Sequence, residues 1–192
     1  LLTKHLNIPI EKLAVTVFKG NDIVPADTES AEIWESLGIP KERIAFLGEE
    51  DNWWPNMEMV GPCGPDTEIF YWRSENDVPE KFDPEDDNWV EVWNNVFMQY
   101  NHEEDGKFTP LKNKNVDTGL GVERVTAILE GQTDNYKSSI WKDIITKLIS
   151  RIEVGYKKKV LNKTIREILD KELDNCIGIK KQFIKDMVLY MI

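Results

Sequence analysis

The chain has 192 residues, of which 41% are hydrophobic and 31% are charged. This composition is typical of a globular protein and excludes disorder over the whole chain. No run of residues approaches the roughly 20 apolar positions of a membrane span, so we expect no contact with a membrane. The two cysteines, Cys63 and Cys176, are too few for a disulfide framework or a structural zinc site, and we expect a cytoplasmic protein.

The net charge of −11 is unevenly distributed along the chain. Residues 1–110 carry 24 acidic and 8 basic side chains, whereas residues 151–192 carry 6 acidic and 10 basic ones. Because phosphate contacts require Lys and Arg, such an acidic chain is a poor general binder of nucleic acid, and we expect no binding to DNA. A polyanion would have to approach through the last third. The alternative is that the acidic part is simply a solvated surface.

The first half of the chain is patterned as strands with one helix between them. β-branched and aromatic residues predict strands over 13–18, 43–47 and 67–72. An amphipathic helix is predicted over 28–37, with Thr28 as its N-cap. Residues 48–66, rich in Gly and Pro, and the acidic residues 74–88 are predicted to be loops.

The second half begins with the clearest strand and ends in helices. Residues 89–100 carry apolar side chains on both faces, which indicates a central strand covered on both sides. Asp105 and Gly106 predict a hairpin turn into a strand over residues 107–111. The last strand is predicted over residues 116–120. A helix is predicted from residue 122, and the pattern is helical from about Lys137 onward. This order predicts an α+β fold with a mostly antiparallel sheet, followed by a helical C-terminal segment.

A Gly-rich junction precedes the helix that begins at residue 122. Gly119 and Gly121 would let the backbone approach a ligand closely, and a helix N-terminus favours an anion. Arg124 stays charged and can fork onto a phosphate. The alternative is a turn in which Arg124 forms a structural ion pair with Glu123 or with an Asp.

Three other features are candidates for lining a small-molecule pocket. Asn94 interrupts an apolar strand face, so it either bonds to the backbone in the core or lines the pocket. Asp117 is either an Asx-type turn residue or the counter-ion of a ligand ammonium. Trp53 and Trp54 either pack in the core or wall the pocket with the glycines around them. Only two histidines are present, which leaves no His-based triad or zinc cluster and disfavours hydrolases and metalloenzymes.

Four segments, taken together, resemble one family. They are DNWW ending at Trp54, GPCGPDTEIFYW, VWNNVFMQYN and NVDTGLGVERVTAILEGQTDNYKSSIW. In this order and spacing they resemble the catalytic domain of the alanyl-tRNA synthetases, over about residues 1–150. The resemblance implies a class II synthetase fold, an antiparallel sheet flanked by helices, with VDTGLGVER as the third signature motif of the class.

The resemblance also implies a reaction and an alanine site. Alanine would attack the α-phosphate of ATP to form alanyl-adenylate and release pyrophosphate, and the alanyl group would then pass to tRNA(Ala). Asp117 and Asn94 would hold the ammonium and carboxylate region of alanine. Trp54, Val96 and Gly119 would wall a pocket only large enough for a methyl side chain.

The same resemblance implies an ATP site. Gly121 and Arg124 would bind ATP, with Arg124 on a phosphate, and Mg²⁺ would accompany the nucleotide. No side chain is implied as a nucleophile or a metal ligand, because the reaction depends on positioning and on charge neutralisation.

The departures from the family pattern lead to further expectations. The first two signature motifs would lie upstream of Leu1, so we expect residues 1–136 to be a partial catalytic core and the isolated chain to be inactive. Residues 137–192 would be a helical segment that either faces tRNA or caps the sheet. Asp66 stands where many members have Cys. The alternative function is a non-catalytic synthetase-like binding module or a truncated paralogue.

Overall fold

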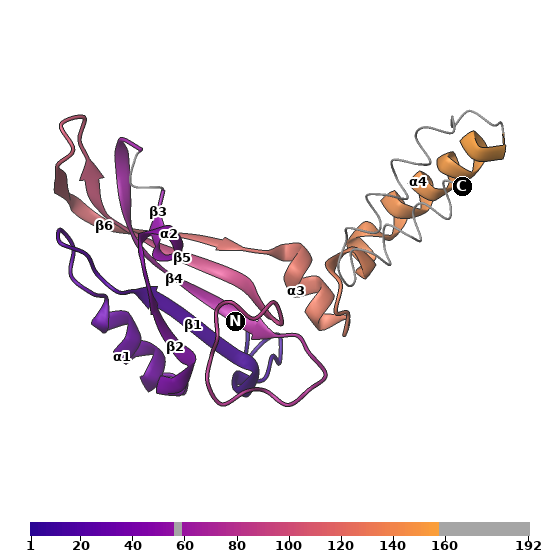
Figure 1. The fold of residues 1–192 in the computed structure, drawn as a ribbon, viewed down its shortest axis with the longest axis horizontal. Coiled ribbons are helices and arrows are strands. Elements are labelled where there is room, and N and C mark those ends of the chain that lie inside the picture. Colours follow the sequence, from indigo (N-terminus) through magenta and orange to yellow (C-terminus); the bar gives the residue numbers. More distant parts are fainter. Residues whose placement is uncertain (56–58, 158–192) are drawn as a thin grey trace. The chain divides into compact units, whose positions relative to one another are not determined.

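A computed structural model describes residues 1–55 and 59–157 of the chain (Figure 1). The chain divides into two compact units, Leu1–Leu129 and Glu130–Ile192, which are described one at a time. The predictions for residues 158–192, which include most of the C-terminal helical segment and its contact with tRNA, lie outside the described residues. The expected division into a core over 1–136 and a segment over 137–192 stays a prediction.

The first unit is built on a six-stranded sheet with the main order β2-β1-β4-β5-β6, and β3 pairs with β4 (Figure 1). The strands are β1 (Leu13–Phe18), β2 (Ile44–Leu47), β3 (Trp53–Trp54), β4 (Gly61–Trp72), β5 (Trp89–His102) and β6 (Phe108–Leu120). β1 and β2 are parallel, and all other neighbours in the sheet are antiparallel. The predicted α+β class with a mostly antiparallel sheet is confirmed.

Short helices connect and cover these strands. They are η1 (Ile10–Lys12), α1 (Thr28–Ser36), η2 (Lys41–Arg43), α2 (Glu49–Asn52) and α3 (Val122–Leu129). The Asp27 carboxylate accepts a hydrogen bond from the Ser30 N–H at the start of α1 (3.0 Å), so the prediction that Thr28 is the N-cap was wrong. Gly38, at a φ of 100°, follows the end of α1 in a conformation that glycine adopts at little cost.

The prediction of a loop over residues 48–66 was wrong. Most of its described residues belong to α2, β3 and the first half of β4. The register of β4 against β5 shifts between Cys63 and Asp66, so a β-bulge accommodates the glycines and prolines that a regular strand would disfavour. Sheet pairing therefore overrides the local preference of this segment. The two strands predicted over 107–111 and 116–120 are likewise one strand, β6.

The loop predicted over residues 74–88 was expected to be solvated, but it covers part of the sheet. Phe82 from this loop is only 3% exposed and packs against Trp72 and Trp89. The central position predicted for β5 is confirmed, since it lies between β4 and β6. Its side chains are mostly half-buried and those of β6 mostly exposed, so β5 is covered less fully than predicted.

Buried side chains lie on both faces of the sheet. Because strand residues alternate between faces, Leu13 and Val15 of β1 pack on one side, in a cluster to which Trp34 of α1 contributes. Ala14 and Phe18 of β1 point to the other side, where each belongs to a separate aromatic cluster. The space between these two aromatic clusters holds polar side chains, and the candidate site lies there.

The second unit is described as far as residue 157 and contains η3 (Asn135–Lys137) and α4 (Ser139–Lys157). The Asp134 carboxylate accepts from the Tyr136 N–H (2.9 Å), and Glu130 accepts from the Ser139 N–H at the start of α4 (2.8 Å). The helical pattern predicted from about Lys137 is confirmed over these residues. In the described part of the chain, no helix has the length and apolar character needed to cross a membrane.

Gly64 predicts a stability effect, because it lies where β4 passes the backbone of β5. A Cβ atom at this position would come within 1.8 Å of the Phe97 carbonyl oxygen, so one backbone would have to move. We expect Gly64→Ala to lower the free energy of unfolding by about 1–3 kcal/mol, as overpacking does elsewhere, measured by thermal denaturation. Gly119→Ala is the matched control, because a Cβ there meets no atom within 4 Å. Equal losses in the two variants would contradict this account.

Candidate functional site

The pairing of β5 with β6 brings four predicted site residues together. Asn94 of β5 lies opposite Gly119 of β6, and Val96 lies opposite Asp117. Directly opposed residues of antiparallel strands share a face and have Cβ atoms about 4.5–5.5 Å apart. The residues expected to hold the ammonium, the carboxylate and the methyl group of alanine therefore occupy adjacent positions on one face of the sheet.

The exposure of these four residues leaves the site open. Val96 is 6% exposed and Asn94 is half-buried, whereas Asp117 and Gly119 are exposed. The space above Gly119 is empty, since a Cβ there would meet no atom within 4 Å. Asp117 lies inside strand β6 and not in a turn, so its carboxylate does not serve as the Asx-type turn residue of the alternative interpretation.

The two tryptophans of β3 have different environments. β3 pairs with β4, with Trp54 opposite Gly64. Trp53 is 4% exposed, and its ring lies 5.4 Å from that of Phe18, between ring centroids, in one of the aromatic clusters. Trp54 is 46% exposed. Trp53 therefore fills the core, and Trp54 keeps a surface that can serve as a pocket wall.

Arg124 lies in the first turn of α3 and reaches back to β5. Its Nη1 atom donates to the Glu91 backbone carbonyl and to the Glu91 carboxylate, each at 2.7 Å. The ion pair is therefore formed with Glu91 and not with the acids considered from the sequence. Gly121 gives this side chain room, since a Cβ there would lie 3.2 Å from the Arg124 Cδ. The Arg124 side chain is 41% exposed, so other nitrogens of its fork can still meet an anion.

A buried polar network beneath Asn94 was missed in the sequence analysis. Asp66, 2% exposed, accepts hydrogen bonds from the side-chain amides of Asn52 (2.8 Å) and Asn94 (3.1 Å). Asn52 closes helix α2, is fully buried, and also donates to the Thr16 hydroxyl of β1 (2.8 Å). The network therefore connects the candidate site to the centre of the sheet.

A second buried carboxyl group lies beside this network. Glu68 of β4 pairs with Asn94 of β5. Burial, followed by the charges of Glu91 and Asp66, raises the pKa of Glu68 to about 8, and the hydrogen bond from Thr16 only partly opposes this. Burial also raises the pKa of Asp66, opposed by the hydrogen bonds from the two amides. Glu68 is therefore mostly neutral at pH 7, and this face carries less negative charge than the sequence indicates.

One sequence signal could have revealed part of this network. A strand extended back to residue 61 places Asp66 and Glu68 on the same face as the half-buried Phe70, by the two-residue period of a strand. Two acidic residues on a largely buried strand face indicate a site rather than a solvated surface. No comparable signal exists for Asn52, whose burial depends on the four-residue helix α2.

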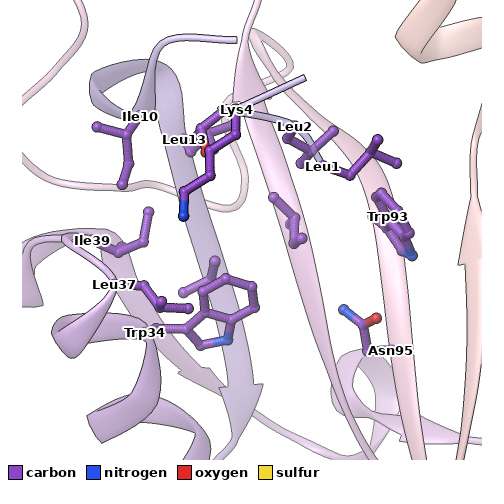
Figure 2. Close-up of a pocket in the computed structure, with 13 residues that line it drawn as sticks. Leu1, Leu2, Lys4, Ile10, Leu13, Trp34, Leu37, Ile39, Trp93 and Asn95 are labelled. Atoms are coloured by element: carbon purple, nitrogen blue, oxygen red, sulfur yellow. The ribbon is translucent and has the colours of Figure 1, made fainter. Parts of the chain in front are cut away.

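A cavity lies on the opposite face of the sheet (Figure 2). It has a volume of about 460 Å³, and Trp34, Ile39 and Trp93 are among its mainly apolar lining. Asn95 also lines it and, like Trp93, alternates along β5 with the site residues Asn94 and Val96. The cavity is therefore distinct from the candidate site and belongs to the core packed around α1.

Comparison with known proteins identifies the family of the chain. A family profile described as "tRNA synthetases class II (A)" matches residues 1–172. The chain is 48% identical over 171 residues to the alanine–tRNA ligase of Treponema denticola, covering 87% of the chain and 28% of that relative. It is 46% identical over 146 residues to the alanine–tRNA ligase of Borrelia hermsii, covering 75% of the chain and 25% of that relative.

A relative from an animal is similar over a comparable share of the chain. The chain is 46% identical over 147 residues to the cytoplasmic alanine–tRNA ligase of Caenorhabditis elegans, covering 75% of the chain and 15% of that relative. The chain thus spans about a quarter of the length of the two bacterial relatives. Since the family profile covers most of its residues, and the sheet has the architecture expected of the class, the chain belongs to the class II tRNA synthetases.

Proposed function

We propose that this chain carries the alanine-binding residues of an alanine–tRNA ligase. In the complete enzyme, ATP would activate alanine to alanyl-adenylate, and the alanyl group would pass to tRNA(Ala). The observation that carries this proposal is the shared face on which Asp117 lies opposite Val96, next to Gly119 opposite Asn94. The names of the relatives, all alanine–tRNA ligases, support the choice of amino acid.

The proposed site supplies one group for each part of alanine. The exposed Asp117 carboxylate suits the ammonium group, and the Asn94 amide suits the carboxylate. Val96 gives a small apolar floor for the methyl group, and Gly119 leaves the space above it free. Trp54, with nearly half of its surface exposed, would close one side and exclude larger side chains.

The proposed ATP contacts lie at the end of β6. Arg124 would bind a phosphate with the part of its guanidinium that does not contact Glu91, and Gly121 keeps the backbone clear beside it. Activation brings the alanine carboxylate and the ATP phosphates together. The main contributions of the protein are therefore fixed positive charge and the orientation of the two reactants. Among the described residues, no three His, Cys, Asp or Glu side chains converge to hold a metal ion, so Mg²⁺ is proposed only as an ion carried by the ATP phosphates.

Two further parts of the proposal concern location and tRNA. The name of the Caenorhabditis elegans relative includes the word cytoplasmic, which supports a cytoplasmic location. Residues 151–192 carry 10 basic and 6 acidic side chains, which supports a helical segment that faces tRNA phosphates.

The proposed function can be tested by grafting the aligned segment of this chain into the Treponema denticola ligase in place of its own. We expect the graft to catalyse alanine-dependent exchange of pyrophosphate into ATP and to reject valine, whereas the chain alone should give background exchange. A graft that folds cooperatively but shows no exchange would contradict a catalytic role. Alanine binding by that inactive graft would instead support the non-catalytic binding module.

The role of Asp117 gives a quantitative prediction. Asp117→Asn in the graft removes a charge-assisted hydrogen bond worth about 1.5–3 kcal/mol, so the KM for alanine should rise about tenfold or more. The KM for ATP should change little. Asp105→Asn, in the exposed turn between β5 and β6, is the control and should leave both values unchanged. A parallel loss for alanine and ATP would show that Asp117 acts on the fold instead.

A protonated Glu68 carries no charge that would repel the alanine carboxylate or ATP. Its raised pKa also predicts that the stability of the fold depends on pH. Its folded-state pKa of about 8 lies above the ordinary value of 4.5, so the folded chain binds this proton more tightly than the unfolded chain. The stability that Glu68 contributes is complete below about pH 4.5 and is lost as the pH rises through about 8.

We therefore expect Glu68→Gln to flatten the fall of Tm with rising pH. The Tm of the variant should exceed that of the parent in alkaline solution, by about 2–4 °C for each kcal/mol of penalty that is relieved, and should match it in acid. Thermal denaturation across this pH range measures the effect. Glu80→Gln, at an exposed loop position, should keep the slope of the parent. Identical slopes for the parent and Glu68→Gln would refute the assignment.

A further inference from the structure

Two polar groups of the Asn94 amide have no partner among the described residues, the Oδ1 atom and one hydrogen on Nδ2. An asparagine side chain ends in one acceptor oxygen and a nitrogen that carries two hydrogens. The Asn94 Oδ1 atom is buried without a hydrogen-bond partner among the described residues. Its Nδ2 atom donates one hydrogen to the Asp66 carboxylate, at 3.1 Å. Of the two, the second hydrogen on Nδ2 is the group that we assign to a ligand, since the Oδ1 atom is buried.

Asp66 can impose this orientation because an ionised carboxylate only accepts hydrogen bonds. If the Asn94 amide turned over, its oxygen would face the carboxylate, and a buried hydrogen bond would be replaced by two opposed acceptors. Leaving such buried groups unsatisfied costs about 1–3 kcal/mol.

Asp66 is itself held in place on its other side. It is 2% exposed, and its Oδ1 atom is occupied by Asn52, which is fully buried at the end of α2. Its second oxygen faces Asn94 from the neighbouring strand. A carboxylate fixed by one buried amide and bonded to another transmits its orientation to the second amide.

We infer that Asp66 is a positioning residue that fixes Asn94 as a hydrogen-bond donor toward the carboxyl group of the bound amino acid. The inference rests on the proposed function and deepens it. A donor suits the carboxyl oxygens, whereas the ammonium group is left to the Asp117 carboxylate on the neighbouring strand. Asp66 does not touch the substrate and acts only through Asn94.

The test reverses the polarity of the Asp66–Asn94 pair. Asp66→Asn removes the acceptor, and the double variant Asp66→Asn/Asn94→Asp restores a hydrogen bond with the donor on β4 and the carboxylate on β5. The Tm of the full chain reports on the fold, and pyrophosphate exchange by the graft reports on the substrate. Asp51→Asn is the control, because it removes the same charge at an exposed position next to Asn52.

We expect Asp66→Asn to raise the KM for alanine about tenfold, the equivalent of about 1.4 kcal/mol, with the KM for ATP unchanged. The double variant should recover Tm but not the KM for alanine. Recovery of both Tm and the KM for alanine would overturn the inference. A pair that only stabilises the fold needs one donor and one acceptor, and it does not matter which of the two positions carries the donor. A KM for alanine that does not change in Asp66→Asn would also overturn it.

Isopropylamine gives a second readout, which holds even if the double variant does not recover Tm. This molecule is alanine with the carboxylate replaced by a methyl group, so it competes with alanine through the ammonium and methyl contacts but cannot use the contact to the carboxylate. Asp66→Asn should leave its inhibition constant unchanged while the KM for alanine rises. Equal losses for both molecules would overturn the inference. An inactive parent graft contradicts the proposed function, whereas an active parent with an unaffected Asp66→Asn variant contradicts this inference alone.

Discussion

A buried carboxylate bonded by two neutral amides is the interaction on which the candidate site depends. Asp66 is almost fully buried, and burying a charge is costly unless hydrogen bonds compensate for its lost hydration. The two amides that compensate come from α2 and from β5, and the α2 amide also bonds to β1. Helix α2 and strands β1, β4 and β5 are therefore held in one arrangement by a single group, and Asn94 is positioned by the same group.

The sheet face that carries Asn94 and Asp117 bears less negative charge than the acidic composition suggests. Burial, followed by the charges of Glu91 and Asp66, raises the pKa of Glu68, which therefore keeps its proton near neutral pH. Glu91 is paired with the guanidinium of Arg124. An anionic ligand would thus meet a face on which two of the acids are already neutralised, one by a proton and one by a cation.

Much of the sheet could be predicted from the sequence, because β-branched and aromatic runs such as 13–18 and 89–100 indicate strands directly. The segment 48–66 could not, since its glycines and prolines favour loops until β5 supplies a pairing partner. The partners of Asp66 and Arg124 lie 14 to 33 residues away along the chain, and no local pattern specifies them. The juxtaposition of Asn94 and Asp117 was implied by family resemblance, and strand register provides it.

The pairing of β5 with β6 has a consequence for the fidelity of the site. A slip of one residue would turn Asp117 to the opposite face of the sheet, because side chains alternate along a strand. Thr118 resists such a slip: on the opposite face, its hydroxyl donates to Asn95 (2.9 Å) and accepts from the Trp93 indole. The face that we propose to bind alanine is thus kept in register by contacts on the opposite face, and a substitution at Thr118 would act on the proposed site from behind the sheet.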